Sequence, residues 1–321
     1  MSHNVLLTGA SGFVGKAILE LLLAQGHTVV AALRKEPSDL DPRVKVARFD
    51  GLDSSTDWRA SLAGVGTVIH SAARVHVMNE TDADPLTAFR KVNVNGTLNL
   101  ARQAVAVGVK RFVFISSIKV NGEGTPKGRP YTADDVPAPV DPYGASKMEA
   151  EAGLRALAEE TGLEVVIIRP VLVYGPGVKA NFRAMMHWLD KGVPLPFGAI
   201  DNRRSLVALA NLADLVLTCV DHPAAANQTF LVSDGEDLST SGLLRRMAGA
   251  LGRPARLLPV PSVLLQWGAT LLGKQSLSQR LCGSLQVDIE KTRSLLGWKP
   301  PVSVDEALGL TARDYQGKTR K

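Results

Sequence analysis

The chain has 321 residues, of which 45% are hydrophobic and 21% charged, a composition typical of a globular protein with material for one large domain or two smaller ones. Its net charge of +6 comes from scattered Lys and Arg residues rather than from a basic run. This pattern argues against a nucleic-acid partner and favours an anionic small molecule.

Strand-like and helix-like segments alternate through the first half of the chain. Continuous apolar runs predict buried strands at 4–8, 27–33, 44–49, 66–73, 111–117 and 163–170. Apolar residues at helical spacing predict helices at 13–26, 84–108 and 141–162. Because these strands are apolar throughout and alternate with helices, we predict a doubly wound, Rossmann-type α/β fold with a parallel sheet covered on both faces.

The amino-acid composition changes after Pro170, where Gly and Pro become more frequent. We expect a main sheet domain and a smaller second part, divided as 1–175 plus about 205–233 for the first, and 176–204 plus 234–321 for the second. The apolar region 257–273 contains two prolines and is too short to span a bilayer. We expect it to form an amphipathic helix against the core rather than a membrane-surface helix, without stable membrane insertion.

The two cysteines indicate a reducing compartment, and their spacing does not fit a metal centre. Cys219 and Cys282 are far apart and show no metal-ligand spacing, so we expect reduced thiols and no metal. An apolar run follows closely on Met1, so no signal peptide is expected, and we predict a cytoplasmic protein.

A glycine-rich turn joins the first predicted strand to the first helix. In "TGASGFVG", Gly9, Gly12 and Gly15 are spaced three apart, with Ser11 and Phe13 between them. Glycine lets backbone N–H groups approach a pyrophosphate, and the start of the following helix attracts the anion. The spacing differs from the G-x-G-x-x-G fingerprint, so the turn alone is also compatible with a purely structural role.

The end of the second predicted strand bears on the choice of cofactor. An acidic residue commonly stands there in NAD sites, whereas this chain has Arg34 followed by Lys35. Two cations suit a 2′-phosphate, so we predict NADP(H) in preference to NAD(H); solvated loop charges are the alternative. Asp50, after the third strand, is placed to accept from the adenine amino group, or is a turn residue.

The catalytic candidates are Ser117, Tyr143 and Lys147. Tyr143 and Lys147 in "YGASK" are four residues apart, so they share one helix face. A nearby ammonium should lower the pKa of the phenol and make it usable for proton transfer. Ser117 ends a predicted parallel strand, at the edge where ligands bind, and can hydrogen-bond a substrate oxygen.

Together, "TGASGFVG", "SSIKVNG" and "YGASK" resemble the extended short-chain dehydrogenases/reductases, in particular the nucleotide-sugar epimerase, dehydratase and reductase branch. Further matching segments are "HSAAR", "NVNGT", "RPVLVYGPG" and "LGWKP". The resemblance implies an NAD(P)-binding Rossmann domain and a smaller substrate-binding part.

The resemblance also implies roles for individual positions. The implied catalytic residues are Ser117, Tyr143 and Lys147. The implied cofactor-binding residues are Gly9, Ser11, Gly12, Phe13, Gly15, Arg34, Asp50, Leu52, Ala72, Ala73, Asn93, Tyr143 and Lys147. The implied substrate-binding residues, for the diphosphate of a nucleotide sugar, are Ser117, Asn181, Arg204 and Arg280, while Arg169 begins the approach to the substrate loops.

Several reactions are compatible with this branch. Its dehydratases carry an Asp-Glu pair directly after the catalytic hydroxyl residue, whereas here Ile118 and Lys119 follow Ser117, so a dehydratase is disfavoured. Arg34 favours NADPH and therefore reduction of the C4 ketone of a UDP-4-keto-6-deoxy-N-acetyl sugar in bacterial surface polysaccharide synthesis. The alternative is an NAD-dependent UDP-hexose or UDP-N-acetylhexosamine 4-epimerase. A non-catalytic cofactor-binding regulator is disfavoured because all three catalytic residues are present.

The resemblance also implies an oligomeric state. Relatives in this branch imply a homodimer packed through the helices at 84–108 and 141–162.

Overall fold

Seven parallel strands form the main sheet of the computed structural model, which describes residues 3–35, 37, 40–75, 84–271, 279 and 281–319. The strand order is β3-β2-β1-β4-β5-β6-β9. In chain order these strands are β1 (Asn4–Thr8), β2 (Thr28–Leu33), β3 (Lys45–Arg48), β4 (Thr67–His70), β5 (Arg111–Ile115), β6 (Glu164–Pro170) and β9 (Gln228–Val232). The order reverses direction between β1 and β4, where open α/β sheets bind their ligands.

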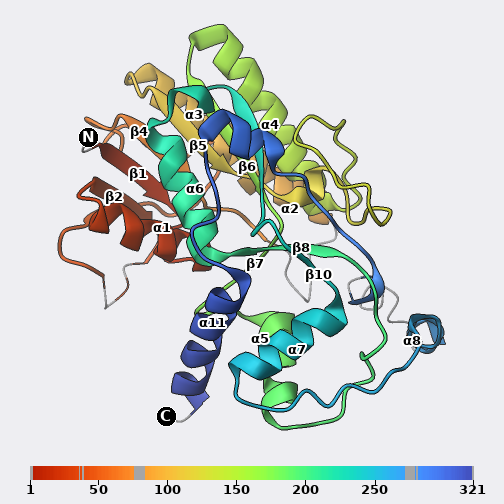
Figure 1. Cartoon of the computed structure of the whole chain (residues 1–321). Helices are drawn as coiled ribbons and strands as arrows, with labels where there is room; N and C mark the ends of the chain where they lie inside the picture. The colour runs from red at the N-terminus through yellow and green to blue at the C-terminus, as the bar shows by residue number, and fades with distance from the viewer. Residues whose placement is uncertain are drawn as a thin grey trace.

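Helices cover both faces of this sheet (Figure 1). Successive side chains of β1 point to opposite faces: Val5 and Leu7 belong to one buried cluster and Leu6 to the other. The first cluster also takes in α1 (Phe13–Ala24) and α6 (Leu209–Asp221), and the second takes in α3 (Thr97–Ala106) and α4 (Pro142–Thr161). The predicted doubly wound α/β fold is therefore confirmed, and burial on both faces explains why the strands are apolar throughout.

The predicted helix at 84–108 is present but is not a regular α-helix throughout. It consists of α2 (Pro85–Phe89), a π-helical segment η1 (Arg90–Gly96) and α3. A Cβ at Gly96 would lie 2.8 Å from the Leu52 side chain, so the π-helical segment lies tightly against the loop after β3. Widened turns of this kind are common beside functional sites.

A smaller part of the chain forms its own core below the main sheet (Figure 1). Its sheet has the order β10-β8-β7, and its core includes Tyr174, Met186 and Leu244. Its elements are β7 (Leu172–Tyr174), α5 (Ala180–Asp190), β8 (Arg204–Ala208), β10 (Asp237–Leu238), α7 (Thr240–Ala250) and α11 (Val304–Thr319). We expected about 205–233 to return to the main sheet: β9 joins this sheet and α6 packs on one of its faces, whereas β8 pairs with β7 in the smaller sheet.

The remaining elements are short. They are the 3-10 segments η2 (Ile118–Val120) and η3 (Pro223–Ala225), and the helices α8 (Ser262–Leu271) and α10 (Glu290–Leu296).

Helix α8 differs from the prediction for the apolar region 257–273. A helix does form there, but none of its residues is buried, and it projects from the body of the molecule at the right of Figure 1. The expected packing against the core is wrong, because an apolar composition favours burial without specifying what provides it. None of the described helices is both long and apolar enough to cross a bilayer.

Candidate active site

The carboxyl ends of the main strands bring the predicted site residues to one edge of the sheet. β1 leads into the glycine turn, β2 into Arg34, β4 into Ala72 and β5 into Ser117. Since all seven strands are parallel, these segments lie along a common edge although they are far apart in the chain.

The glycine turn is built by close backbone contacts. Gly9 has a φ of +74°, a left-handed conformation that favours glycine, and its carbonyl accepts a 2.8 Å hydrogen bond from the N–H of Gly12. Helix α1 begins directly afterwards, and no side chain caps its N-terminus. The first N–H groups of α1 are thus available to an anion placed over the turn.

This turn fits the pyrophosphate of a dinucleotide. A Cβ at Gly9 would lie 2.8 Å from the Ala72 nitrogen, and a Cβ at Gly15 would lie 2.0 Å from the Gly9 carbonyl oxygen. Both positions therefore require glycine, and the backbone surface that they leave bare is the kind that phosphate groups approach. Of the other turn residues, Ser11 is exposed and Phe13 is half-buried.

Replacing Gly15 with alanine should disturb both the turn and the binding of NAD. Because the clash is with backbone, it cannot be relieved by a rotamer change, and overpacking of this kind costs about 1–3 kcal/mol of unfolding free energy. Thermal denaturation and NAD titration would measure the two effects. Gly249→Ala in α7, where a Cβ meets no atom within 4 Å, is the matched control. Equal stability and NAD affinity for Gly15→Ala and the unsubstituted chain would contradict the assignment.

The positions predicted to contact the adenosine half of the cofactor differ in exposure. Arg34 and Asp50 are exposed at the ends of their strands. Leu52 is buried against Gly96 and therefore has a packing role in this structure. Their contacts with a cofactor stay predictions.

A buried hydrogen-bond chain, which the sequence patterns did not reveal, links β1 to the first residue of α3. The Thr8 hydroxyl and Nδ1 of His70 are 2.8 Å apart, and Nε2 of His70 is 2.9 Å from the Thr97 hydroxyl. Burial lowers the pKa of His70 to about 3, so this imidazole is neutral. The N–H of Ala72 also donates to the Thr8 hydroxyl over 3.2 Å, which fixes Ala72 beside the turn.

Asn93 holds neighbouring segments together. Its Oδ1 accepts from the N–H of Arg74 at 2.8 Å, and its Nδ2 donates to the Arg74 carbonyl and to the Ser146 hydroxyl, both at 3.0 Å. Ser146 in turn donates to the Tyr143 carbonyl. The Asn93 amide donors are thus used within the chain, and Asn93 positions the loop after β4 against the helix that carries Tyr143.

The three catalytic candidates lie around the end of β5. Ser117 caps η2, and its Oγ accepts from the N–H of Lys119 at 3.2 Å. Tyr143 and Lys147 lie one turn apart on α4, and Asp141 caps this helix by accepting from the N–H of Gly144 at 2.7 Å. The Lys147 ammonium is buried, donates to the Ile115 carbonyl at 2.8 Å and lies 4.3 Å from the centre of the Phe114 ring.

The prediction that the pKa of Tyr143 is lowered is wrong for the chain without a bound cofactor. Burial, and secondarily the charge of Asp141, raise the pKa of Tyr143 to about 12. Burial likewise lowers the pKa of Lys147 to about 7, although the charge of Glu151 opposes this shift. Desolvation is the largest cause of both shifts, because burial disfavours the charged form of each group. A further positive charge beside Tyr143 is needed to make the phenol acidic.

A buried ion-pair cluster that the sequence analysis missed supports these residues. Glu151, one helical turn beyond Lys147, accepts from Nη2 of Arg169 at 2.6 Å and from the Ser116 hydroxyl at 2.6 Å. Burial favours a raised pKa for Glu151, but the hydrogen bond and charge of Arg169 outweigh it and lower the pKa. The positions 143, 147 and 151 share one face of α4, and this four-residue spacing is the signal that could have revealed Glu151.

Lys119 joins η2 to the start of α4. Its ammonium forms ion pairs with Asp141 and, at 2.8 Å, with Glu123. A Cβ at Gly144 would lie 2.7 Å from the Lys119 carbonyl oxygen, so the two segments are in close contact. The residue that stands in place of a dehydratase acid thus anchors the N-terminus of the catalytic helix.

The predicted substrate residues are less closely gathered. Asn181 is exposed at the start of α5, and Arg204 begins β8 with Nη1 donating to the Gly283 carbonyl at 3.0 Å. Arg280 lies outside the described residues. Among the described residues, no group of three or more His, Cys, Asp or Glu side chains could hold a metal.

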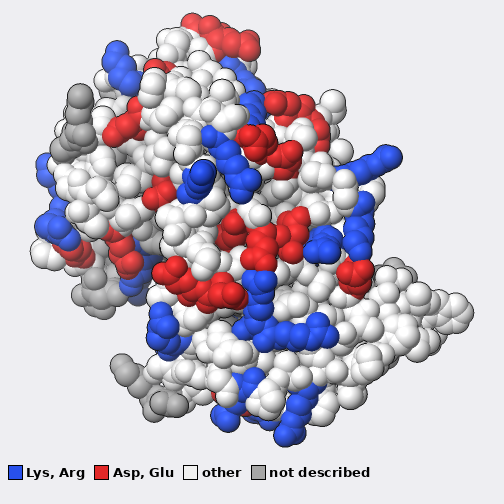
Figure 2. Space-filling model, viewed as in Figure 1, with Lys and Arg blue, Asp and Glu red and all other residues white. Residues whose placement is uncertain are grey.

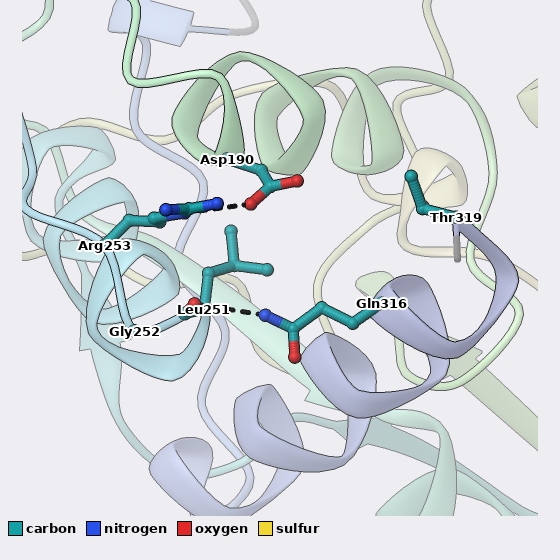
Figure 3. Close-up of a pocket in the computed structure, with 6 residues that line it drawn as sticks. All are labelled: Asp190, Leu251, Gly252, Arg253, Gln316 and Thr319. Carbon is teal, nitrogen blue, oxygen red and sulfur yellow. Dashed lines mark hydrogen bonds and ion pairs between the residues drawn. The ribbon is translucent and has the colours of Figure 1, made fainter.

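Two cavities lie outside the catalytic cluster. One of about 940 Å³ begins at Ser11 and Gly12 of the turn and runs between α1, α6 and α11. The other, of about 300 Å³, lies between the ends of α5, α7 and α11, where Asp190 pairs with Arg253 (Figure 3). Neither is lined by Ser117, Tyr143 or Lys147, so we define the site by its residues at the sheet edge.

Comparisons with known proteins connect this arrangement to one family. Residues 5–233 match the model of the NAD dependent epimerase/dehydratase family. The chain is 49% identical to a UDP-glucose 4-epimerase of Vibrio cholerae over 98% of its own length and 96% of that protein.

Solved structures share the fold. A UDP-glucose 4-epimerase of Thermotoga maritima, with UDP-glucose, aligns over 99% of this chain and 100% of its own at 24% identity, with a TM-score of 0.77. A UDP-N-acetylglucosamine 4-epimerase of Bacillus cereus aligns over 98% of this chain and 100% of its own at 19% identity, with a TM-score of 0.81.

These relatives correct the predicted reaction. The expected NADPH-dependent reduction of a 4-keto sugar is wrong, because the similarity to a 4-epimerase at 49% identity extends over nearly the whole chain. The prediction relied on Arg34, an exposed residue at the end of β2. A cation at this position affects whether the cofactor carries a 2′-phosphate on its adenosine ribose. It does not determine whether a transferred hydride is returned to the substrate.

Proposed function

The chain belongs to the NAD dependent epimerase/dehydratase family and is an enzyme of the extended short-chain dehydrogenase/reductase type, and from this premise we propose that it is a UDP-hexose 4-epimerase. The observation that carries the proposal is the 49% identity to a UDP-glucose 4-epimerase over 98% of the chain, which includes the glycine turn and the residues around β5 and α4. UDP-glucose is the substrate that this similarity favours.

The chain's own residues would hold the cofactor and handle the proton. Gly9, Gly12 and Gly15 would offer backbone to the pyrophosphate, and Lys147 would bind the nicotinamide ribose. The oxidised nicotinamide, when bound, supplies a hydride acceptor and a positive charge. Tyr143 takes the proton from the C4 hydroxyl and returns it after the sugar has presented its other face. Ser117 donates a hydrogen bond to the same oxygen, an interaction typically worth about 3 kcal/mol.

The need for a positive charge follows from the site itself. With its pKa raised to about 12, Tyr143 is protonated at neutral pH, and burial lowers the pKa of Lys147 to about 7. A cation brought into this buried site favours the phenolate strongly, because the low dielectric strengthens their attraction. We infer that cofactor binding makes Tyr143 competent as a base.

The choice between NAD and NADP is a separate inference. Arg34 and Lys35 at the end of β2 favour a 2′-phosphate and thus NADP(H). An epimerase, however, returns the hydride that it removes and consumes no reductant, which favours a tightly held NAD. We propose NAD as the resident cofactor, with the preference for NADP(H) as the alternative that extraction would reveal.

The remaining assignments complete the proposal. We assign NAD binding to 1–175 and about 205–233, and substrate binding to 176–204 and 234–321, with Asn181 and Arg204 facing the diphosphate. A homodimer through the segment 84–108, which forms α2, η1 and α3, and through α4 stays part of the proposal. A reducing compartment such as the cytoplasm is part of the proposal, because Cys219 and Cys282 form no disulfide.

Incubation of the purified protein with UDP-glucose tests this function. We expect UDP-galactose to form, to an equilibrium mixture, without net change in NADH or NADPH absorbance, and we expect acid extraction to release NAD. UDP-N-acetylglucosamine is the second substrate to compare. Stoichiometric oxidation of NADPH by a 4-keto sugar, with no C4 epimer formed from either UDP-sugar, would refute the proposal.

A further inference from the structure

Helix α8 presents apolar side chains to solvent, and no described residue covers them. It has no buried residue, and four of its side chains are largely exposed: Val263 (59%), Leu264 (62%), Trp267 (71%) and Leu271 (85%). Leu258, just before the helix, is also 52% exposed. Exposed apolar residues that are contiguous, rather than scattered, mark an interaction surface.

Along the sequence, the charge on either side of this helix is one-sided. Positions 257–273 contain no charged residue, and positions 238–287 contain six Lys or Arg residues and no Asp or Glu. Figure 2 shows the same contrast: the projection at the right carries neither blue nor red, whereas blue side chains with little red lie over the region of α5 and α7.

Basic side chains stand at the base of the projection. Backbone bridges pair Leu195 with Leu257 and Ala199 with Pro261, so the chain leading into α8 lies along the segment after α5. Arg245 donates to the Gly198 carbonyl at 3.2 Å, which places a guanidinium beside this segment, and its side chain is exposed.

We propose that α8 is a membrane-surface anchor, which inserts its apolar side chains into the interface of a bilayer that contains anionic lipids. An uncharged helix of 10 residues is too short to span but can lie in the headgroup region, where a tryptophan is favourable. Arg245 and Arg256, which are exposed near the base of the projection, then face lipid phosphates, whereas Arg246 and Arg253 are paired with Glu236 and Asp190. The catalytic edge of the sheet takes no part in this contact.

Flotation of the full-length protein with vesicles tests the anchor. We expect binding to vesicles of phosphatidylcholine with phosphatidylglycerol, weaker binding to phosphatidylcholine alone, and release as salt is raised. The double variant Leu264→Ser with Trp267→Ser should lower the partition coefficient by at least about tenfold, because two large apolar side chains are lost. Its thermal stability should stay unchanged, since no residue of α8 is buried.

Val136→Ser is the matched control, because Val136 is 86% exposed in a loop far along the chain from α8. It should bind vesicles as the unsubstituted protein does. In a Trp188→Phe background, which removes the other exposed tryptophan, the emission of Trp267 should shift to the blue with anionic vesicles.

Three results would overturn the proposal. The first is no binding to anionic vesicles at low salt. The second is binding that the double variant retains in full. The third is a lipid-free oligomer that the double variant dissociates, which would assign α8 to a contact between copies of the chain.

Discussion

Replacement of Tyr143 with phenylalanine is expected to lower the rate of C4 epimerisation by about 10²- to 10⁴-fold, the usual contribution of a general acid–base group. The substitution removes only the hydroxyl, and the ring can keep its edge-on contact with Phe89, whose ring centre is 5.9 Å away. In the described part of the chain this hydroxyl makes no hydrogen bond, so its loss should leave stability and NAD binding nearly unchanged. Steady-state kinetics on UDP-glucose and NAD titration would separate the two effects.

Tyr315→Phe provides the control for this experiment. Tyr315 is buried, and this substitution likewise removes one hydroxyl, which lies 3.3 Å from Nδ1 of His187 in the smaller part of the chain. Its rate should stay within a few-fold of the parent. Loss of one ordinary hydrogen bond lowers the free energy of unfolding by only about 0.5–1.5 kcal/mol, so the variant stays folded. A Tyr143→Phe enzyme that kept the parental rate would remove Tyr143 from the catalytic assignment.

Replacement of Glu151 with alanine is expected to lower the free energy of unfolding by about 3–5 kcal/mol, because it leaves a buried charge without its partner. Arg169 is 1% exposed and gives two nitrogens to Glu151, at 2.9 and 2.6 Å. The Ser116 hydroxyl loses its acceptor as well. Urea denaturation monitored by circular dichroism would measure the loss.

Glu149→Ala on the same helix is the control, because its ion pair with Arg90 is partly exposed and such pairs contribute about 0–1 kcal/mol. Glu151→Gln keeps the shape of the side chain and should fold if the alanine variant does not.

The stabilisation by Glu151 should depend on pH. Since the pKa of Glu151 is lowered in the folded chain, its stabilisation is present above the ordinary value of 4.5 and is lost as the pH falls below that value. Equal losses for the variants at 149 and 151 would show that the buried cluster is not a stabilising unit.

The supporting cluster also explains why the catalytic helix can hold buried charges. Lys147 is held by the Ile115 carbonyl and Glu151 by Arg169, so each polar end has a partner. These contacts fix the end of β5 against α4, which carries Tyr143. A rigid frame of this kind lets one phenol serve proton transfer in both directions without rearrangement of the chain.

Much of the fold followed from local sequence patterns. The strands at 4–8 and 163–170 and the helix at 141–162 agree with β1, β6 and α4 to within a residue. Runs of apolar residues, a capping aspartate at Asp141 and a glycine at Gly162 act within a few residues of one another, so they can be read along the chain. The same is true of the glycine turn and of the spacing between Tyr143 and Lys147.

The reaction was harder to infer, because it does not depend on the motif residues alone. Ser117, Tyr143 and Lys147 are compatible with both reduction and epimerisation, and Arg34 concerns the ribose of the cofactor. What distinguishes the two is whether the sugar can turn and take its hydride back, which depends on the shape of the substrate side of the site. The similarity of the whole chain to a UDP-glucose 4-epimerase therefore carried more weight than any single position.

The sequence by itself determined the order of strands and helices, the glycine turn and the identity of the residues that meet at the sheet edge, because these depend on near neighbours. Only the tertiary structure decided the pKa directions of Tyr143 and Lys147, the partners of Glu151 and the solvent exposure of α8. Each of these depends on burial and on contacts between distant segments: the pairing of Glu151 with Arg169 joins a helix to a strand, and no segment among the described residues buries α8. Desolvation and long-range packing arise only when the chain has folded, so local patterns do not encode them.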